Sequence, residues 1–174
     1  DYIRLTNETE ELAVRINDNN TTVDIPDLTN YKLVHIVVAR EAGDNGDIKT
    51  YINGTLVDTH GGDSNTDQEF AYRYLGSFGG SASMKGVLDE VSIFNTELSS
   101  TEVSELFNGG MALDARDHSE ASNLEGYWRN NGTDQWDDLS TNSNHGTVTT
   151  HTDTVTIQLQ EVPYFGTDSL GLPM

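Results

Sequence analysis

Apolar residues at the start of the chain fall into short runs separated by polar turns. Leu12, Val14 and Ile16 alternate with smaller or polar side chains, which is the two-residue period of a strand with one buried face. The polar cluster at 17–20 is typical of a turn. Strands are therefore predicted over residues 2–5, 12–16 and 22–25.

Residues 31–40 form a longer run that is nearly all apolar. Such a run predicts a central strand that is covered on both faces. His35 lies inside it, and we expect a packed side chain whose ring nitrogens are satisfied locally, rather than a ligand or a general base. Asn53-Gly54 predicts a two-residue hairpin turn. Further strands are predicted over 48–51, 56–57, 70–75 and 84–94, and a long polar loop is predicted over 58–69.

The segment GVLDEVSIFNTELSSTEVSELFNGG, residues 86–110, predicts a strand followed by a short helix. Ser99 and Glu102 have the spacing of a capping box, in which each side chain bonds the backbone N–H of the other residue. Leu98 and Val103 stand where a hydrophobic staple would join them across the helix start. The Asn-Gly-Gly that begins at residue 108 is a stop signal.

The same segment resembles the closing strand and helix of laminin-G-like domains, in the concanavalin A-like lectin/glucanase superfamily. YKLVHIVVAREAGDNGDIKTYINGTLVDT resembles the paired central strands of that family, and YLGSF resembles the short strand before the last one. The resemblance covers roughly residues 30–110. One departure is the Trp that the family usually has near Lys32–Leu33, which this chain lacks. The resemblance implies an all-β fold: an antiparallel β-sandwich of the concanavalin A-like jelly-roll type, with one short helix after the closing strand.

LEGYWRNNGTDQWDDLSTNSNHGTVTT, residues 124–150, resembles the family's N-terminal signature, an aromatic strand followed by an Asp/Asn-rich loop. It either closes the same sandwich or opens a second repeat. The expected division is 1–110 for the C-terminal part of a sandwich, 111–123 for a polar connector, 124–159 for the closing element and 160–174 for an extended arm. Because the family's opening strands are missing, we hypothesise that upstream residues, another chain or an assembly lattice completes the sheet.

Charge narrows the range of partners. The chain has 9 Lys and Arg against 29 Asp and Glu, a formal charge of −20. Such a surface repels nucleic acids and anionic membranes, and it is compatible with cations and neutral sugars. The chain has no Cys and no apolar run long enough to span a membrane.

Catalytic motifs are not found in the sequence. Glucanases of the superfamily carry a Glu-x-Asp-x-(x)-Glu strand, which places their two carboxylates on one face. Asp89 and Glu90 are adjacent instead and are expected on opposite faces of their strand. The chain is therefore interpreted as non-enzymatic.

Oxygen-rich loops are the candidates for a metal, and structural Ca²⁺ is the ion that they would hold. The resemblance adds Asp89, because the matching Asp helps to hold Ca²⁺ in several superfamily members. Asx-turn hydrogen bonds are the alternative explanation for each loop. The predicted calcium residues are Asp89, Asp63, Asn65, Asp67, Asp138 and Asn142.

Sugar binding needs an aromatic platform together with amide or carboxylate partners. The candidates by residue type are Trp136, Tyr72, Tyr74, His60 and Asn65, whereas Trp128 is expected in the core. Two functions follow. The first is a structural or decorating module of a virion or another extracellular assembly, with neighbouring protein chains as partners and a capacity for glycans. The alternative is a carbohydrate-binding adhesion module of a secreted bacterial protein.

Overall fold

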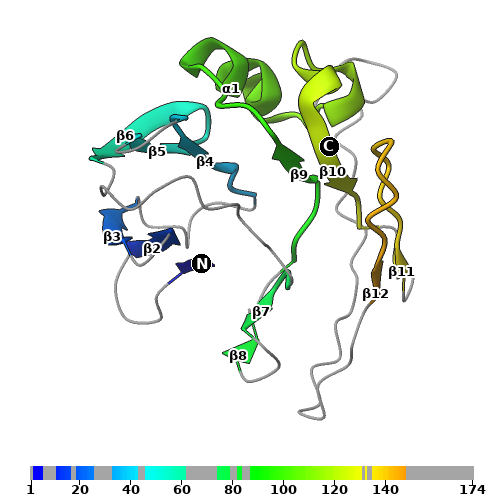
Figure 1. Cartoon of the computed structure of the whole chain (residues 1–174), viewed down its shortest axis with the longest axis horizontal. Helices are drawn as coiled ribbons and strands as arrows, with labels where there is room; N and C mark the ends of the chain where they lie inside the picture. Colours follow the sequence, from blue (N-terminus) through cyan, green and yellow to red (C-terminus); the bar gives the residue numbers. More distant parts are fainter. Residues whose placement is uncertain are drawn as a thin grey trace, which may run out of the picture.

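The computed structural model describes residues 2–5, 11–16, 19–25, 33–42, 46–61, 74–78, 82–83, 87–130, 132 and 135–147. Two three-stranded antiparallel sheets form its main body (Figure 1). One contains β1 (Tyr2–Leu5), β2 (Glu11–Ile16) and β3 (Asn19–Asp24); the other contains β4 (Ile36–Arg40), β5 (Ile48–Ile52) and β6 (Thr55–His60). The remaining strands pair as β7 (Ser77–Phe78) with β8 (Ala82–Ser83), β9 (Val91–Phe94) with β10 (Leu124–Trp128), and β11 (Gln135–Trp136) with β12 (Gly146–Thr147).

The main core lies between the two three-stranded sheets. Leu12 and Val14 of β2 pack there with Ile48 and Ile52 of β5. These alternate positions point to one face of each strand, as the two-residue period predicts. The expected antiparallel sandwich with one short α-helix is confirmed for the part of the chain that the structure describes.

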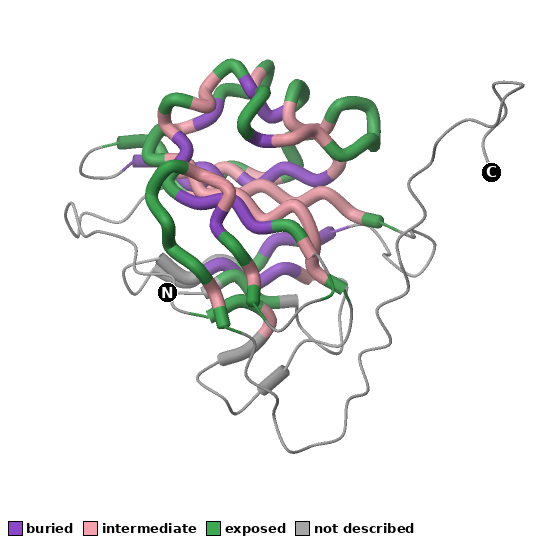
Figure 2. The backbone as a smooth tube through the Cα atoms, turned by 90° about the vertical axis from the view of Figure 1, so that its right-hand side faces the viewer, coloured by how far each residue is buried: buried purple, intermediate pink, exposed green. Residues whose placement is uncertain are grey.

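The helix α1 (Ser100–Phe107) covers the opposite face of the β4–β5–β6 sheet (Figure 1). Val103 of α1 is fully buried and packs with Tyr51 of β5 and Ala39 of β4. Buried stretches accordingly run through the middle of the molecule in Figure 2, with α1 and its following turns on the outside.

Both faces of β4 are packed, as its apolar sequence predicts. Ile36 and Val38 face the sandwich core, and Val37 and Ala39 face α1. The central position is nevertheless taken by β5, because the sheet order is β4–β5–β6 among the described strands.

The predicted helix ends are confirmed. The Ser99 side chain accepts the Glu102 N–H, and the Glu102 carboxylate accepts the Ser99 N–H at 2.6 Å. Leu98 and Val103 belong to one buried cluster, as a hydrophobic staple requires. Asn108 ends α1 in the left-handed conformation, with φ 48°. The short turn η2 (Asn108–Gly110) then leads out of the helix.

The turn between β5 and β6 is also confirmed, since Asn53 and Gly54 both have positive φ. His35 lies beside this turn, and its ring stacks on Phe107 of α1 with centroids 5.7 Å apart. Burial lowers the pKa of His35. Its Nδ1 is buried and has no hydrogen-bond partner among the described residues, so the packed ring is confirmed but local satisfaction of both nitrogens is wrong.

The strand predicted over 84–94 is shorter than expected. Glu90 has φ 53°, and β9 begins only after it. The Asp89 side chain accepts the Glu90 N–H at 2.9 Å, a local bond that competes with strand pairing. Asp89 and Glu90 therefore precede the strand, and their placement on opposite faces of a strand is wrong.

The connector over 111–123 is more ordered than its polar sequence indicates. It contains two 3₁₀ turns, η3 (Ala115–Asp117) and η4 (Ala121–Asn123). His118 between them is buried; its Nε2 lies 2.9 Å from the Glu102 carbonyl oxygen, and its Nδ1 accepts the Glu120 N–H. The ring is thus a neutral Nε2–H tautomer that ties the connector to α1. After it, β10 pairs antiparallel with β9. The division into four segments remains a prediction.

Candidate functional site

The candidate site is the junction between the start of β9 and the end of β10. Tyr127 and Arg129 converge there on the Glu90 carboxylate: the Tyr127 hydroxyl donates to one oxygen, and the Arg129 Nε donates to the other at 2.7 Å. The left-handed backbone at Glu90 turns this side chain towards β10. Glu90 thereby connects the start of β9 to side chains that lie 37 and 39 residues later in the sequence.

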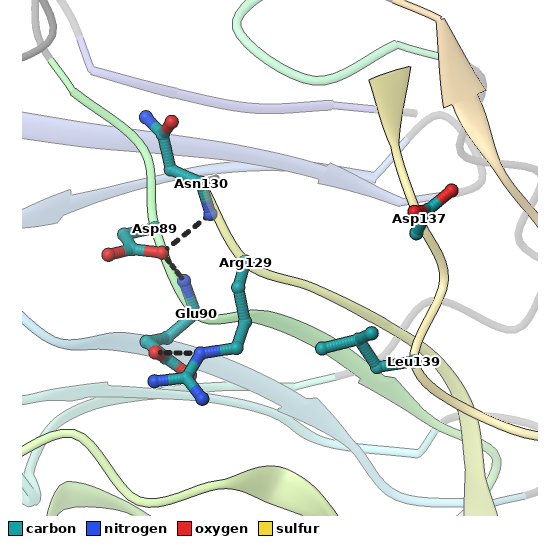
Figure 3. Close-up of a pocket in the computed structure, with 6 residues that line it drawn as sticks. All are labelled: Asp89, Glu90, Arg129, Asn130, Asp137 and Leu139. Atoms are coloured by element: carbon teal, nitrogen blue, oxygen red, sulfur yellow. Dashed lines mark hydrogen bonds and ion pairs between the residues drawn. The ribbon is translucent and has the colours of Figure 1, made fainter. Parts of the chain in front are cut away.

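Asp89 makes a second connection across the same junction. Its Oδ1 accepts the N–H groups of Glu90 and Asn130, and the Asn130 amide donates to the Leu88 carbonyl at 3.3 Å. A pocket of about 370 Å³ opens beside these groups (Figure 3). Its lining residues are Asp89, Glu90, Arg129, Asn130, Asp137 and Leu139.

Burial shifts the pKa values of Glu90 and Tyr127 at this junction. It raises the pKa of Glu90, and the bonds from Tyr127 and Arg129 offset only part of that effect. Burial and the bond to Glu90 together raise the pKa of Tyr127. At the edge of the junction, the Arg116 guanidinium lowers the pKa of Asp114 to about 2. The Asp114 carboxylate also lies 3.8 Å from Arg129, so charges of both signs alternate here.

Asp138 organises the Asp/Asn-rich loop that follows β11. Its carboxylate is buried and accepts the backbone N–H groups of Tyr127, Ser140 and Asn144 at 2.8–2.9 Å. Burial alone would raise the pKa of Asp138, but these N–H groups outweigh it and lower the pKa. The Leu139 N–H adds a bond to the Tyr127 carbonyl oxygen at 2.7 Å. The loop is therefore fastened along the edge of β10 that faces away from β9.

Trp128 and Gly126 also help to attach the loop after β11 to β10. The Trp128 indole is buried, as expected, and its N–H donates to the Asn144 carbonyl oxygen at 2.9 Å. Gly126 lies directly under the ring, since a Cβ placed there would be only 2.2 Å from a ring carbon. The Asn142 and Asn144 amides both donate to the Glu125 carbonyl oxygen.

The structure separates the predicted calcium residues. Asp89 lines the pocket, whereas Asp138 and Asn142 bond to β10 as described above; Asp63, Asn65 and Asp67 lie outside the described residues. Within the described part of the chain, no three Asp, Glu or His side chains come close enough together to hold a metal ion. The Asx-type bonds of Asp138 account for its position without a metal, and calcium binding remains a prediction.

The predicted sugar-binding residues are also spread out. Tyr74 is 60% exposed, and Trp136 is half-buried. His60 ends β6, which lies on the opposite side of the molecule from β11, the strand of Trp136 (Figure 1). Tyr72 and Asn65 lie outside the described residues. None of the described candidates lines the pocket, although Trp136 directly precedes Asp137, which does.

Sequence reasoning missed Glu90, Tyr127 and Arg129 as one cluster. Their partners are distant in the sequence, and the left-handed conformation at Glu90 has no local signal. Tyr127 and Arg129 were visible only as parts of an aromatic-basic strand.

Comparison with known proteins agrees with this architecture. The family model described as the concanavalin A-like lectin/glucanases superfamily matches residues 2–104, which is more than half of the chain. The match ends inside α1, so Glu90 lies within it, whereas Tyr127, Arg129 and Asp138 lie beyond it. No curated protein and no solved structure matches the chain significantly.

Domains of this kind are carbohydrate-binding or structural modules, are typically non-catalytic, and are commonly extracellular or surface-exposed. In the described residues, no helix has the length and apolar character that a membrane span requires. With more than half of its length matched and a sandwich of the expected type, the chain belongs to the concanavalin A-like lectin/glucanase superfamily.

Proposed function

We propose that the chain is a non-enzymatic structural or decorating module of an extracellular assembly, such as a virion surface. The observation that carries this proposal is that the carboxylates of the junction and of the loop after β11 are bonded to other parts of the same chain. The Asp138 carboxylate accepts three backbone N–H groups, and the Glu90 carboxylate is bonded by Tyr127 and Arg129. Groups that are used in this way stabilise the join between segments and have few lone pairs left for a substrate.

The hydrogen bonds that Asp89 and Glu90 already make support the same proposal. A general acid and a nucleophile have to reach one substrate bond from defined distances. At the junction, Glu90 is already bonded twice, and Asp89 uses one oxygen for two N–H groups. An acidic surface with a charge of −20 also suits a module that stays soluble while it is displayed.

Sedimentation of the native source tests the proposal. Particles are separated on a density gradient, and this chain is quantified in each fraction by mass spectrometry. A structural module sediments with large particles at a fixed ratio to the other particle proteins. A chain found only in the slowly sedimenting fractions contradicts the proposal.

A carbohydrate-binding adhesion module is the second candidate, and the exposed Tyr74 favours it. The Tyr74 side chain is 60% exposed, so its ring has a free face on which a sugar could stack. Pyranose rings stack on aromatic faces and bond to carboxylates through their hydroxyls.

A glycan array tests this second candidate. The wild-type chain is compared with Tyr74→Ala, which removes the ring, and with Tyr74→Phe, which keeps it. Binding that is lost in the first variant and kept in the second supports the adhesion module. Equal binding by all three chains, or no binding by any of them, contradicts a role for Tyr74. Repeating the array with a chelator shows whether Ca²⁺ is required.

A further inference from the structure

The sequence contains four Asn-Gly pairs, at residues 45–46, 53–54, 108–109 and 131–132. An Asn that precedes Gly is chemically reactive, because the glycine backbone nitrogen can approach the Asn carboxamide carbon without steric hindrance from a side chain. The structure describes both residues of the second and third pairs, which allows their environments to be compared.

Asn53-Gly54 is held in place from several sides. The Asn53 Oδ1 accepts the His35 N–H at 3.0 Å, and the Asn53 N–H donates to the His35 carbonyl oxygen at 2.9 Å. Gly54 also packs under Phe107, since a Cβ there would lie 2.9 Å from the ring. Reaction at this pair requires the turn to detach from both His35 and α1.

In contrast, Asn108 and Gly109 are both exposed to solvent. No described residue bonds the Asn108 carboxamide. Gly109 has φ 65°, and a Cβ built on it would meet no atom within 4 Å. The pair also directly follows the last turn of α1, at a helix end, where helices fray most readily.

We propose that Asn108 is a site of spontaneous deamidation in the folded protein. The Gly109 nitrogen attacks the Asn108 Cγ and forms a C–N bond. The Cγ–Nδ2 bond breaks, and the amide nitrogen leaves as ammonia. Water then opens the resulting succinimide at either carbonyl, which produces aspartate or isoaspartate at position 108.

The product alters the end of α1. Either acid places a negative charge at the helix C-terminus, where the helix dipole is also negative. Isoaspartate in addition inserts a methylene into the backbone at a residue whose N–H caps the Ser104 carbonyl oxygen. Phe107 precedes this residue and stacks on His35, so loss of the cap loosens the contact between α1 and the sheet.

Peptide mapping of the aged native protein tests the proposal. The whole chain is incubated at mildly alkaline pH and digested with trypsin. Cleavage after Lys49 and Arg73 separates Asn53 from Asn108, which lies between Lys85 and Arg116. Fragmentation of each peptide locates the amide-to-acid change. We expect Asn108 to react about fivefold faster than Asn53 or more, since one hydrogen bond to be broken is worth about that factor.

Two controls separate structure from sequence. In denaturant, both pairs should react at similar rates, because each Asn precedes Gly. Asn108→Gly keeps the left-handed helix end and removes the reactive amide, so its peptide should show no conversion at position 108. Native rates at Asn53 that equal or exceed those at Asn108 would overturn the proposal, as would a folded protein whose Asn108 stays intact while the denatured chain reacts.

Discussion

Replacing Asp138 by Asn should destabilise the protein strongly despite the near-identical shape of the two side chains. The Asp138 carboxylate accepts three backbone N–H groups from a buried position. One carboxylate oxygen accepts the N–H groups of Tyr127 and Ser140, and the other accepts that of Asn144. The Asn side chain replaces one of these oxygens by an NH₂ group, which cannot accept. At least one backbone N–H therefore loses its partner. Hydrogen bonds to a charged group contribute about 1.5–3 kcal/mol each, and a buried unpaired N–H costs about 1–3 kcal/mol.

The expected loss in the free energy of unfolding is therefore about 3 kcal/mol for Asp138→Asn. Urea unfolding monitored by circular dichroism measures it through the midpoint and slope of the transition. Asp137→Asn is the matched control, because the Asp137 side chain is exposed and accepts from Gln135 on the surface. That control should stay within about 0.5 kcal/mol of the wild type.

The pH dependence provides an independent check. The N–H groups lower the pKa of Asp138 below its unfolded value, so the folded state holds fewer protons there in acid than the unfolded state. The stability that the Asp138 carboxylate gives the folded state is fully present above the unfolded pKa of about 3.9, and it is lost as the pH falls through the folded pKa. Asp138→Asn should flatten this part of the stability curve. A variant with wild-type stability and an unchanged acid limb would refute the inferred role of Asp138.

Three further substitutions test other parts of the fold. Thr50→Val should stabilise the protein by about 1 kcal/mol in urea unfolding, because the Thr50 hydroxyl is buried without a partner in the described structure; destabilisation would point to a hidden bond. Burial lowers the pKa of His35 in the folded state, so protonation of His35 favours the unfolded chain, and the wild type should lose stability as the pH falls below about 6.5. His35→Phe should remove this loss. A difference in unfolding free energy between the wild type and His35→Phe that stays constant across that pH range would be inconsistent with this. Gly126→Ala should cost about 1–3 kcal/mol and shift tryptophan fluorescence to longer wavelength, because the new Cβ collides with the Trp128 ring; an unshifted spectrum would contradict the packing.

Local signals allowed the helix and the main hairpin to be predicted. The capping box of Ser99 and Glu102 and the turn at Asn53-Gly54 depend on residues within a few positions of one another. Hydrogen bonds and turns of that kind involve only residues that are close in the sequence, so a local pattern was enough to predict them.

The junction could not be predicted because it depends on contacts between distant residues. Glu90 meets Tyr127 and Arg129 only after β9 and β10 pair, and its left-handed backbone prevents the strand continuation that the apolar pattern predicts. Asp138 is an intermediate case. Its bond to Ser140 is the local Asx type that was considered, whereas its bond to Tyr127 crosses eleven residues and required the structure.

The order of the connector over 111–123 also could not be predicted from the sequence. The polar segment 111–123 has no apolar period, yet His118 is buried between two short turns and bonded to α1. A single polar residue that is satisfied by a distant carbonyl leaves no trace in a hydrophobicity pattern.

Hydrogen exchange measured residue by residue tests most directly whether residues 124–147 belong to the same folded unit as the sandwich. The amides of Tyr127, Ser140 and Asn144 are compared with those of β5, the most buried strand of the sheet. If the junction integrates this segment, these amides exchange through the same global unfolding as β5 and show a similar free energy of protection. Exchange of the segment at a much lower free energy, with β5 still protected, would show that it is a separable attachment.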